Sequence, residues 1–69
     1  METFYFEISD DFEFIDDLFE EMNLWSLIKN HEPSQNGWTW FETKPIGWRT
    51  YEQILDVLEA EGVGYLELQ

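Results

Sequence analysis

Hydrophobic and polar residues alternate over residues 3–8, and this period of two predicts a β-strand. One face of the strand carries three apolar side chains, Phe4, Phe6 and Ile8. Tyr5 and Glu7 fall on the opposite face. The first element is therefore a half-buried strand.

The apolar spacing then changes to three and four residues, which predicts a helix with a buried stripe of Ile15, Leu18, Phe19 and Met22. Asp10 is expected to be its N-cap, with Glu13 as the capping-box partner three residues later. Asn23 tolerates the left-handed conformation that commonly ends a helix.

Residues 24–30 have two interpretations. They form a second strand, or the helix continues through Trp25, Leu27 and Ile28. The strand is preferred, because a helix reaching Lys29 would be much longer than its neighbours. A polar loop is expected at 31–37, where Pro33 and Asn36-Gly37 are turn signals.

The second half of the chain repeats this order. Trp38 to Glu42 alternates like a strand, and residues 44–47 interrupt it. Thr50 and Gln53 form another capping box, for a helix that buries Tyr51, Ile54, Leu55 and Leu58. Gly62 is expected to end this helix, and Val63 to Leu68 to form the last strand, with Leu66 and Leu68 on one face.

Residues 1–69 are thus predicted to form a single α+β domain. The order strand, helix, strand, strand, helix, strand is that of the ferredoxin-like split βαβ fold, an antiparallel sheet with two helices on one face. If residues 24–30 are helical, the alternative is a three-stranded α+β domain with a longer first helix.

Charge changes the picture most. The chain has 16 Asp and Glu against 3 Lys and Arg, a formal net charge of −13. Six carboxylates fill an arc roughly 140° wide on the first helix, at about 100° per residue: Asp10, Glu13, Asp16, Asp17, Glu20 and Glu21. Phe14 lies at the edge of that arc. Glu52, Asp56 and Glu59 form a line on the second helix, and no cation is expected among either set.

In a split βαβ fold these two lines would run side by side on one outer surface, about 8–10 Å apart. Carboxylates one turn apart are about 5–6 Å from each other, close to the phosphate spacing of a nucleic-acid strand. Such a surface attracts a basic protein by the counterion release that drives DNA binding. The alternative is that these residues are ordinary solvent-exposed faces of amphipathic helices.

The acidic run from Asp10 to Glu21, the line of Glu52, Asp56 and Glu59, and the small size resemble the acidic DNA-mimic inhibitors of phages and mobile elements. Those proteins block restriction or CRISPR nucleases and related nucleic-acid enzymes. The likeness covers charge pattern and size and matches no family motif. Since such inhibitors share no single fold, it assigns no residue a role. A fainter likeness to barstar-type RNase inhibitors covers only residues 58–63.

We therefore expect a non-enzymatic inhibitor that occupies the basic nucleic-acid-binding surface of a host enzyme. The expected partner-binding residues are Asp10, Glu13, Phe14, Asp16, Asp17, Glu20, Glu21, Glu52, Asp56 and Glu59. Acidity of this degree disfavours direct binding to nucleic acid or to an anionic membrane. Adaptation to high salt is a further explanation of the charge.

Catalysis has little support in the sequence. His31 is the one histidine and is expected in a solvated turn, and there is no cysteine nucleophile. No EF-hand spacing occurs among the carboxylates, so no metal site and no cofactor are expected.

The tryptophans support an alternative function, an interaction module or antitoxin-like partner that docks through the hairpin. Most of Trp25, Trp38, Trp40 and Trp48 are expected in the core, and one or two at an interface with Tyr5 and Tyr65 on outward strand faces. The outer sheet face, flanked by Glu7 and Glu67, then suits a partner or a homodimer.

The acidic amino terminus lacks the basic region of a signal peptide, and the chain has no cysteine for disulfides. We expect a cytoplasmic protein, located in the host cytoplasm if a phage encodes it.

Overall fold

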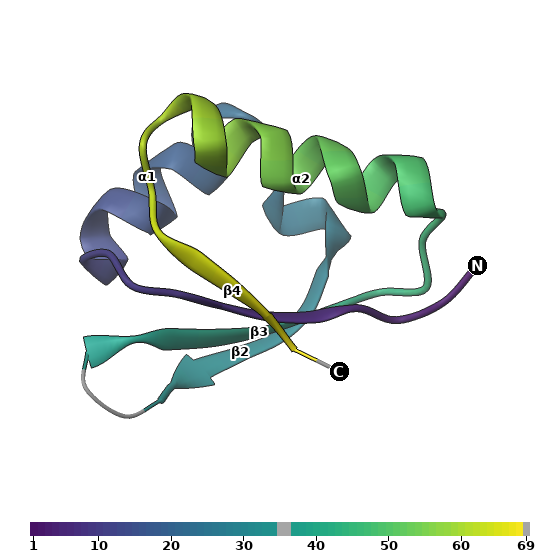
Figure 1. Cartoon of the computed structure of the whole chain (residues 1–69), viewed down its shortest axis with the longest axis horizontal. Helices are drawn as coiled ribbons and strands as arrows, with labels where there is room; N and C mark the ends of the chain where they lie inside the picture. The colour runs from purple at the N-terminus through teal and green to yellow at the C-terminus, as the bar shows by residue number, and fades with distance from the viewer. Residues whose placement is uncertain (35–36, 69) are drawn as a thin grey trace.

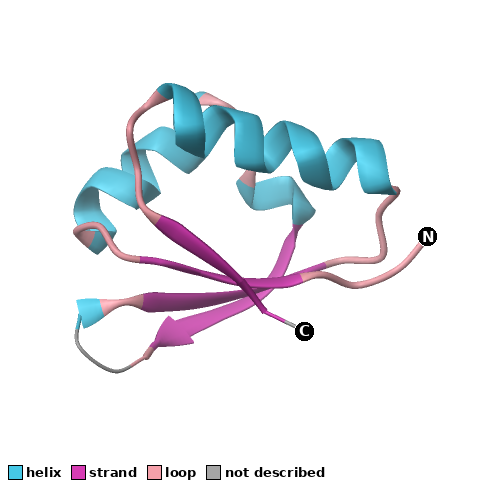
Figure 2. Cartoon of the chain, in the orientation of Figure 1, coloured by secondary structure: helices cyan, strands magenta, loops and turns pink. Residues whose placement is uncertain are grey.

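A four-stranded antiparallel sheet carries two helices on one side in the computed structural model, which describes residues 1–34 and 37–68 (Figure 1). In chain order the elements are β1 (Tyr5–Ile8), α1 (Phe12–Glu21), the short 3₁₀ helix η1 (Trp25–Leu27), β2 (Ile28–Pro33), β3 (Thr39–Thr43), α2 (Trp48–Ala60) and β4 (Tyr65–Leu68). The strand order is β2-β3-β1-β4. Figure 2 shows α1 and α2 in one layer and the four strands in the other. The prediction of an α+β domain with two helices is confirmed.

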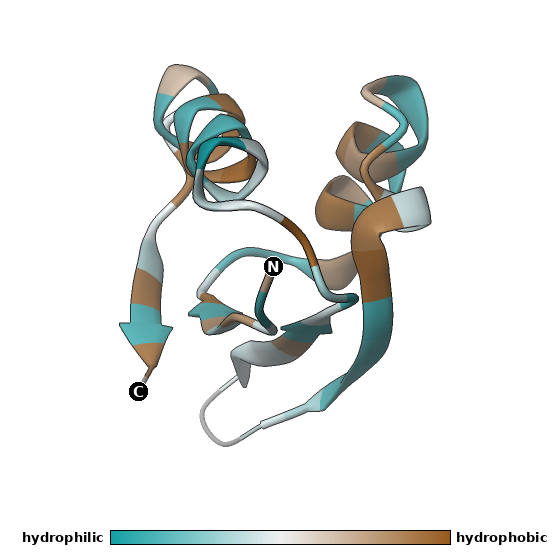
Figure 3. Ribbon diagram, turned by 90° about the vertical axis from the view of Figure 1, so that its right-hand side faces the viewer, coloured by the Kyte–Doolittle hydropathy of each residue, from teal (hydrophilic) through white to brown (hydrophobic). Residues whose placement is uncertain are grey.

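The core lies between the two layers. Phe6 pairs with Phe41 across β1 and β3, and their rings stack at 5.2 Å. Several apolar side chains reach complete burial there, as the alternating and helical patterns predict: Phe6, Ile8, Ile15, Phe19, Phe41, Ile54 and Leu58. Figure 3 views the molecule from a perpendicular direction, with the two helices side by side above the strands.

The ends of α1 differ from the prediction at two residues. Asp11, and not Asp10, occupies the N-cap position, and it makes no side-chain capping bond. Asp10 precedes the cap, because the helix begins only at Phe12, and its Oδ1 atom accepts the backbone N–H of Asp11 at 2.7 Å. Met22 follows the last helical residue and is exposed, so it is not part of the core. Asn23 has a φ of 57°, which confirms it as the left-handed residue that ends the helix.

Residues 24–30 are neither wholly strand nor a continuation of α1. Residues 25–27 form η1, and β2 begins only at Ile28. The predicted strand is therefore confirmed only for residues 28–30, whereas the longer helix and the three-stranded alternative are wrong. The left-handed turn at Asn23 ends α1 before the chain enters the sheet.

The predicted polar loop is partly strand. β2 continues to Pro33, and His31 pairs with Phe41 of β3. Pro33 is tolerated because β2 is an edge strand. Residues 35 and 36 of the predicted loop lie outside the described residues.

The second helix begins two residues before the predicted cap. Gly47 is its N-cap, and Thr50 lies within the first turn. The predicted inner side is confirmed, with Tyr51, Ile54, Leu55 and Leu58 all buried. Gly62 has a φ of 71°, as expected of a residue that ends a helix.

The last strand, β4, is shorter than predicted, and its faces are now assigned. The hydroxyl of Tyr65 donates to Glu59 of α2, and Glu67 accepts the hydroxyl of Tyr51. Tyr65 and Glu67 thus face the helices, which corrects the prediction that Tyr65 points outward. Leu66, 52% exposed, lies on the opposite face of the sheet with Leu68.

Candidate protein-binding site

The first helix presents an exposed acidic surface. Glu13, Asp17, Glu20 and Glu21 are all exposed, and every charged residue of α1 is acidic. Positions 13, 17 and 20 follow the i, i+4, i+7 spacing of one helix side, with neighbours about 5–6 Å apart. We call Glu13, Asp17, Glu20 and Glu21 the α1 acidic face. Phe14 lies beside it and is 42% exposed.

Two of the predicted α1 residues have structural partners. The Oδ1 atom of Asp16 accepts the indole N–H of Trp25 at 2.9 Å, which turns this carboxylate toward η1. Asp10 is half-buried and holds the backbone of Asp11. Neither belongs to the freely exposed set, although both contribute to the negative potential.

The α2 line is exposed but faces another direction. Glu52, Asp56 and Glu59 all lie on the surface, and Glu59 accepts the hydroxyl of Tyr65. Because Tyr65 belongs to the edge strand β4, this flank of α2 is turned toward the sheet edge, away from α1 (Figure 3). The structure does not bring the two acidic lines together on one surface as the sequence predicted.

A cation also adjoins the α2 line. Since α2 begins at Trp48, Arg49 is helical and lies three residues before Glu52. Residues at this spacing are neighbours on a helix surface. The expectation that no cation would accompany the line came from placing the helix start at Thr50, which left Arg49 outside the helix.

The four tryptophans are not core residues. Trp25, Trp38 and Trp40 are half-buried, and Trp48 is 57% exposed. Trp25 packs against Phe19 with ring centroids 5.1 Å apart, whereas Trp40 stacks on Tyr5 at 5.9 Å on the outer sheet face. The prediction that most of the four are core residues is therefore wrong, because none of them is fully buried.

The hydroxyls of Tyr51 and Tyr65 are firmly protonated. Burial raises the pKa of Tyr51, and the Glu67 carboxylate raises it further. The hydrogen bond to Glu59 raises the pKa of Tyr65 to about 12. Both hydroxyls therefore donate hydrogen bonds to carboxylates, and these two bonds join β4 to α2.

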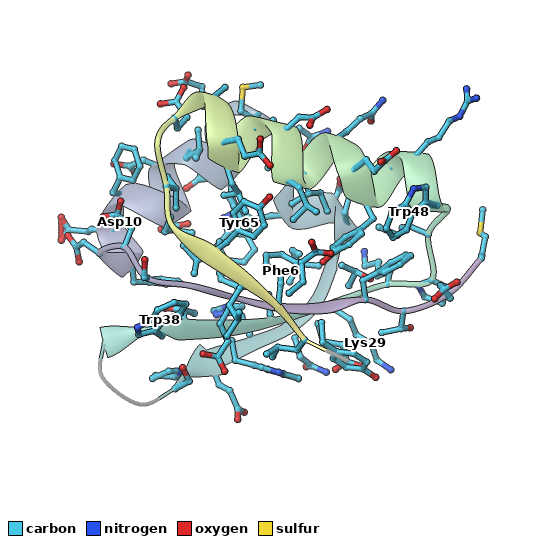
Figure 4. The ribbon with its side chains drawn as sticks, in the orientation of Figure 1. Phe6, Asp10, Lys29, Trp38, Trp48 and Tyr65 are labelled. Atoms are coloured by element: carbon cyan, nitrogen blue, oxygen red, sulfur yellow. The ribbon has the colours of Figure 1, made fainter. Side chains whose placement is uncertain are left out.

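A cavity of about 400 Å³ opens where α1 begins beside the β2–β3 hairpin. Its lining comprises Asp11, Phe12, His31, Pro33, Ser34, Gly37, Trp38 and Thr39. The ring of His31 stacks on Phe12 at 5.4 Å. This histidine is exposed, as the sequence suggested, but it lies in β2 and not in a turn. Figure 4 shows Trp38 and Asp10 at the same end of the molecule.

Sequence reasoning missed this cavity because it needs the pairing of β2 with β3. Only that pairing places His31 opposite Phe41, on the helix side of the sheet. Residues 29–34 are all polar or proline, so no alternation of apolar and polar residues marked β2 in the sequence.

Within residues 1–34 and 37–68, no group of three or more His, Cys, Asp or Glu is arranged to hold a metal ion. None of the described helices has the length and apolar character needed to cross a membrane. Comparison of the chain with protein-family models, curated proteins and solved structures found no match.

Proposed function

We propose that this protein is a non-enzymatic inhibitor that competes with nucleic acid for the basic surface of a nucleic-acid-binding enzyme. A CRISPR or restriction nuclease is the kind of target that the resemblance suggests. The α1 acidic face would make the main contact, and Phe14 would supply an apolar contact at its margin.

The observation that supports this proposal is the uniform sign of α1. Its exposed charged side chains are all carboxylates at helical spacing, in a molecule with a net charge of −13. A surface that only needed solvation would gain from cations at i+3 or i+4, which relieve repulsion. Self-repulsion also opposes folding, so a cationic partner gives this pattern a physical reason.

The α2 line has a different role in this proposal from the contact role that the sequence suggested. Turned toward β4 and adjoined by Arg49, it contributes to the long-range field that attracts a basic partner. The α1 acidic face remains the place of contact.

We also infer that the fold is the split βαβ, ferredoxin-like arrangement. The element order and the antiparallel strand order β2-β3-β1-β4 support this inference. In this arrangement both helices cover one face of the sheet and leave the other face open.

The test is a paired charge reversal on α1, Asp17→Lys with Glu20→Lys. The matched control is Glu2→Lys with Glu61→Lys, which changes net charge equally at exposed positions outside α1. Proteins captured from a host lysate at low salt are eluted with a salt gradient and identified by mass spectrometry. Each captured enzyme is then assayed for nucleic-acid binding with either variant present.

We expect the wild type and the control to displace nucleic acid, and the α1 variant to lose at least tenfold in potency, since close charge reversals cost several kcal/mol. Equal potency of the two variants would contradict a role for α1. Binding that survives moderate salt would contradict an electrostatic contact.

A second candidate function is docking through the outer sheet face. Tyr5 stacks on Trp40 there, and Leu66 is half exposed on the neighbouring strand. Trp and Tyr are enriched among the residues that dominate protein interfaces. If this face binds the partner, Trp40→Ala will abolish capture at all salt concentrations, while the α1 reversal will leave it unchanged.

A further inference from the structure

We propose that the cavity between the start of α1 and the β2–β3 hairpin binds a cationic side chain, specifically the guanidinium of an arginine on the partner protein. The proposal rests on the proposed function in one respect, since it assumes a basic protein partner. The cavity itself is a separate feature: it lies at the start of α1, and no residue of the α1 acidic face lines it.

The walls have the chemistry that a guanidinium prefers. Phe12, His31 and Trp38 all line the cavity, and the Phe12 and His31 rings lie nearly parallel, 18° apart. Trp25 supports His31 from the side, with ring centroids 4.8 Å apart. Aromatic faces attract cations, Trp most strongly, and arginine stacks on them more often than lysine does.

Asp11 supplies a charged partner at the same place. This residue lines the cavity and is exposed, and its side chain makes no capping hydrogen bond with α1. A carboxylate beside aromatic rings can accept the N–H groups of a guanidinium whose plane stacks on those rings. The volume of about 400 Å³ falls within the usual range for ligand pockets, about 300–1,000 Å³.

Electrostatics favour a cation over an anion here. The amino end of a helix carries roughly half a positive charge, which by itself attracts anions. Around this end, however, stand three carboxylates, those of Asp10, Asp11 and Glu13. They outweigh the helix end, and the net charge of −13 acts in the same direction.

The test uses the complete protein and N-acetyl-arginine amide, with the corresponding citrulline amide as an uncharged probe of nearly the same shape. Binding is followed by NMR through the indole N–H of Trp38 and the ring protons of His31. We expect saturable arginine binding near 1 mM, as suits a single side chain, and at least fivefold weaker binding of citrulline.

Two variants, each with a matched control, locate the site. Asp11→Asn should weaken arginine binding about fivefold, the upper range for one exposed ion pair, and asparagine keeps a residue suited to the N-cap. Glu2→Gln removes the same charge at the opposite end of the molecule and should leave binding within about twofold, because distant exposed charges are screened. Trp38→Ala should abolish the effect on His31, whereas Trp48→Ala, at the end opposite Trp38, should preserve it (Figure 4).

Three results would overturn the proposal: no saturable binding, equal binding of arginine and citrulline, or equal losses in Asp11→Asn and Glu2→Gln. These measurements need no partner protein. If arginine does not bind in the cavity, the test of the α1 acidic face is unaffected. If the α1 charge reversal has no effect, the result for the cavity still holds.

Discussion

Asp16 and Trp25 show how one hydrogen bond changes the role of a carboxylate. Both residues are half-buried, and the indole N–H donates to Asp16 across nine residues of sequence. Trp25 in turn packs on Phe19 and His31. Asp16 therefore helps to fix the η1 segment against α1, whereas its neighbour Asp17 is exposed.

We expect Asp16→Ala to lower the free energy of unfolding by about 1 kcal/mol more than Asp17→Ala, because it leaves the indole donor without its partner. The two variants make the same change in charge and in helix propensity, so each controls for the other. Urea denaturation measures the difference, and Asp16→Asn should recover part of it. Identical midpoints for the two alanine variants would show that the hydrogen bond adds nothing to stability.

Tyr65 gives the protein a stability change in the alkaline range. Its folded pKa is raised from 10 to about 12, first by the hydrogen bond to Glu59 and then by desolvation. The folded state thus holds this proton more tightly than the unfolded state. Its stabilising contribution is complete below pH 10 and is lost as pH rises toward 12.

Thermal unfolding between pH 10 and 12 should therefore show a smaller loss of stability in Tyr65→Phe than in the wild type. Tyr5→Phe removes a tyrosine from the outer sheet face and is the control. Should both variants lose stability in parallel over this range, the Tyr65–Glu59 bond is not responsible.

At the level of elements, periodicity predicted the inner faces better than the ends. The buried residues of α1 and α2 were predictable because a helix must place one stripe against the sheet. The starts were not, since Asp10 and Thr50 match a capping motif that the chain does not use. Local motifs of this kind compete with tertiary contacts that a sequence does not display.

The same limit explains what was missed in the candidate site. Exposure of the α1 carboxylates follows from helical spacing, but the direction of the α2 line depends on where β4 lies. Arg49 is a neighbour of Glu52 only because α2 begins at Trp48, and the sequence did not predict that starting point.

Gly47 offers a test of how α2 begins. It is the N-cap in extended conformation, φ −80° and ψ 161°, and a Cβ there would meet nothing within 4 Å. Gly47→Ser should stabilise the protein by about 0.5 kcal/mol, because the new hydroxyl can accept a backbone N–H of the first turn. Gly47→Ala, which adds a Cβ without an acceptor, is the control in chemical denaturation. A serine variant no more stable than the alanine variant would contradict this capping geometry.

At the scale of the whole molecule, the large net negative charge destabilises the folded state. Sixteen carboxylates surround a core supplied by only 69 residues. Their mutual repulsion lowers stability, and dissolved salt screens it, since the Debye length falls from about 30 Å at 0.01 M to about 8 Å at 0.15 M.

We expect the melting temperature to rise by roughly 5 °C over that range of salt, equivalent to about 1 kcal/mol for a domain of this size. The triple variant Glu13→Gln, Asp17→Asn, Glu20→Gln should melt higher than the wild type at low salt and respond less to added salt. Calorimetry at several salt concentrations measures both. An unchanged salt response in the triple variant would mean that repulsion on α1 is not a main cost.

The free edge of β4 gives this charge another consequence. An uncovered outer strand can serve as a template on which further chains add, strand by strand, into fibres. Each added copy would have to approach a growing assembly of the same strong charge. Repulsion between the carboxylates of different copies thus opposes such polymerisation. Acidification neutralises the carboxylates, so we expect the protein to polymerise at low pH.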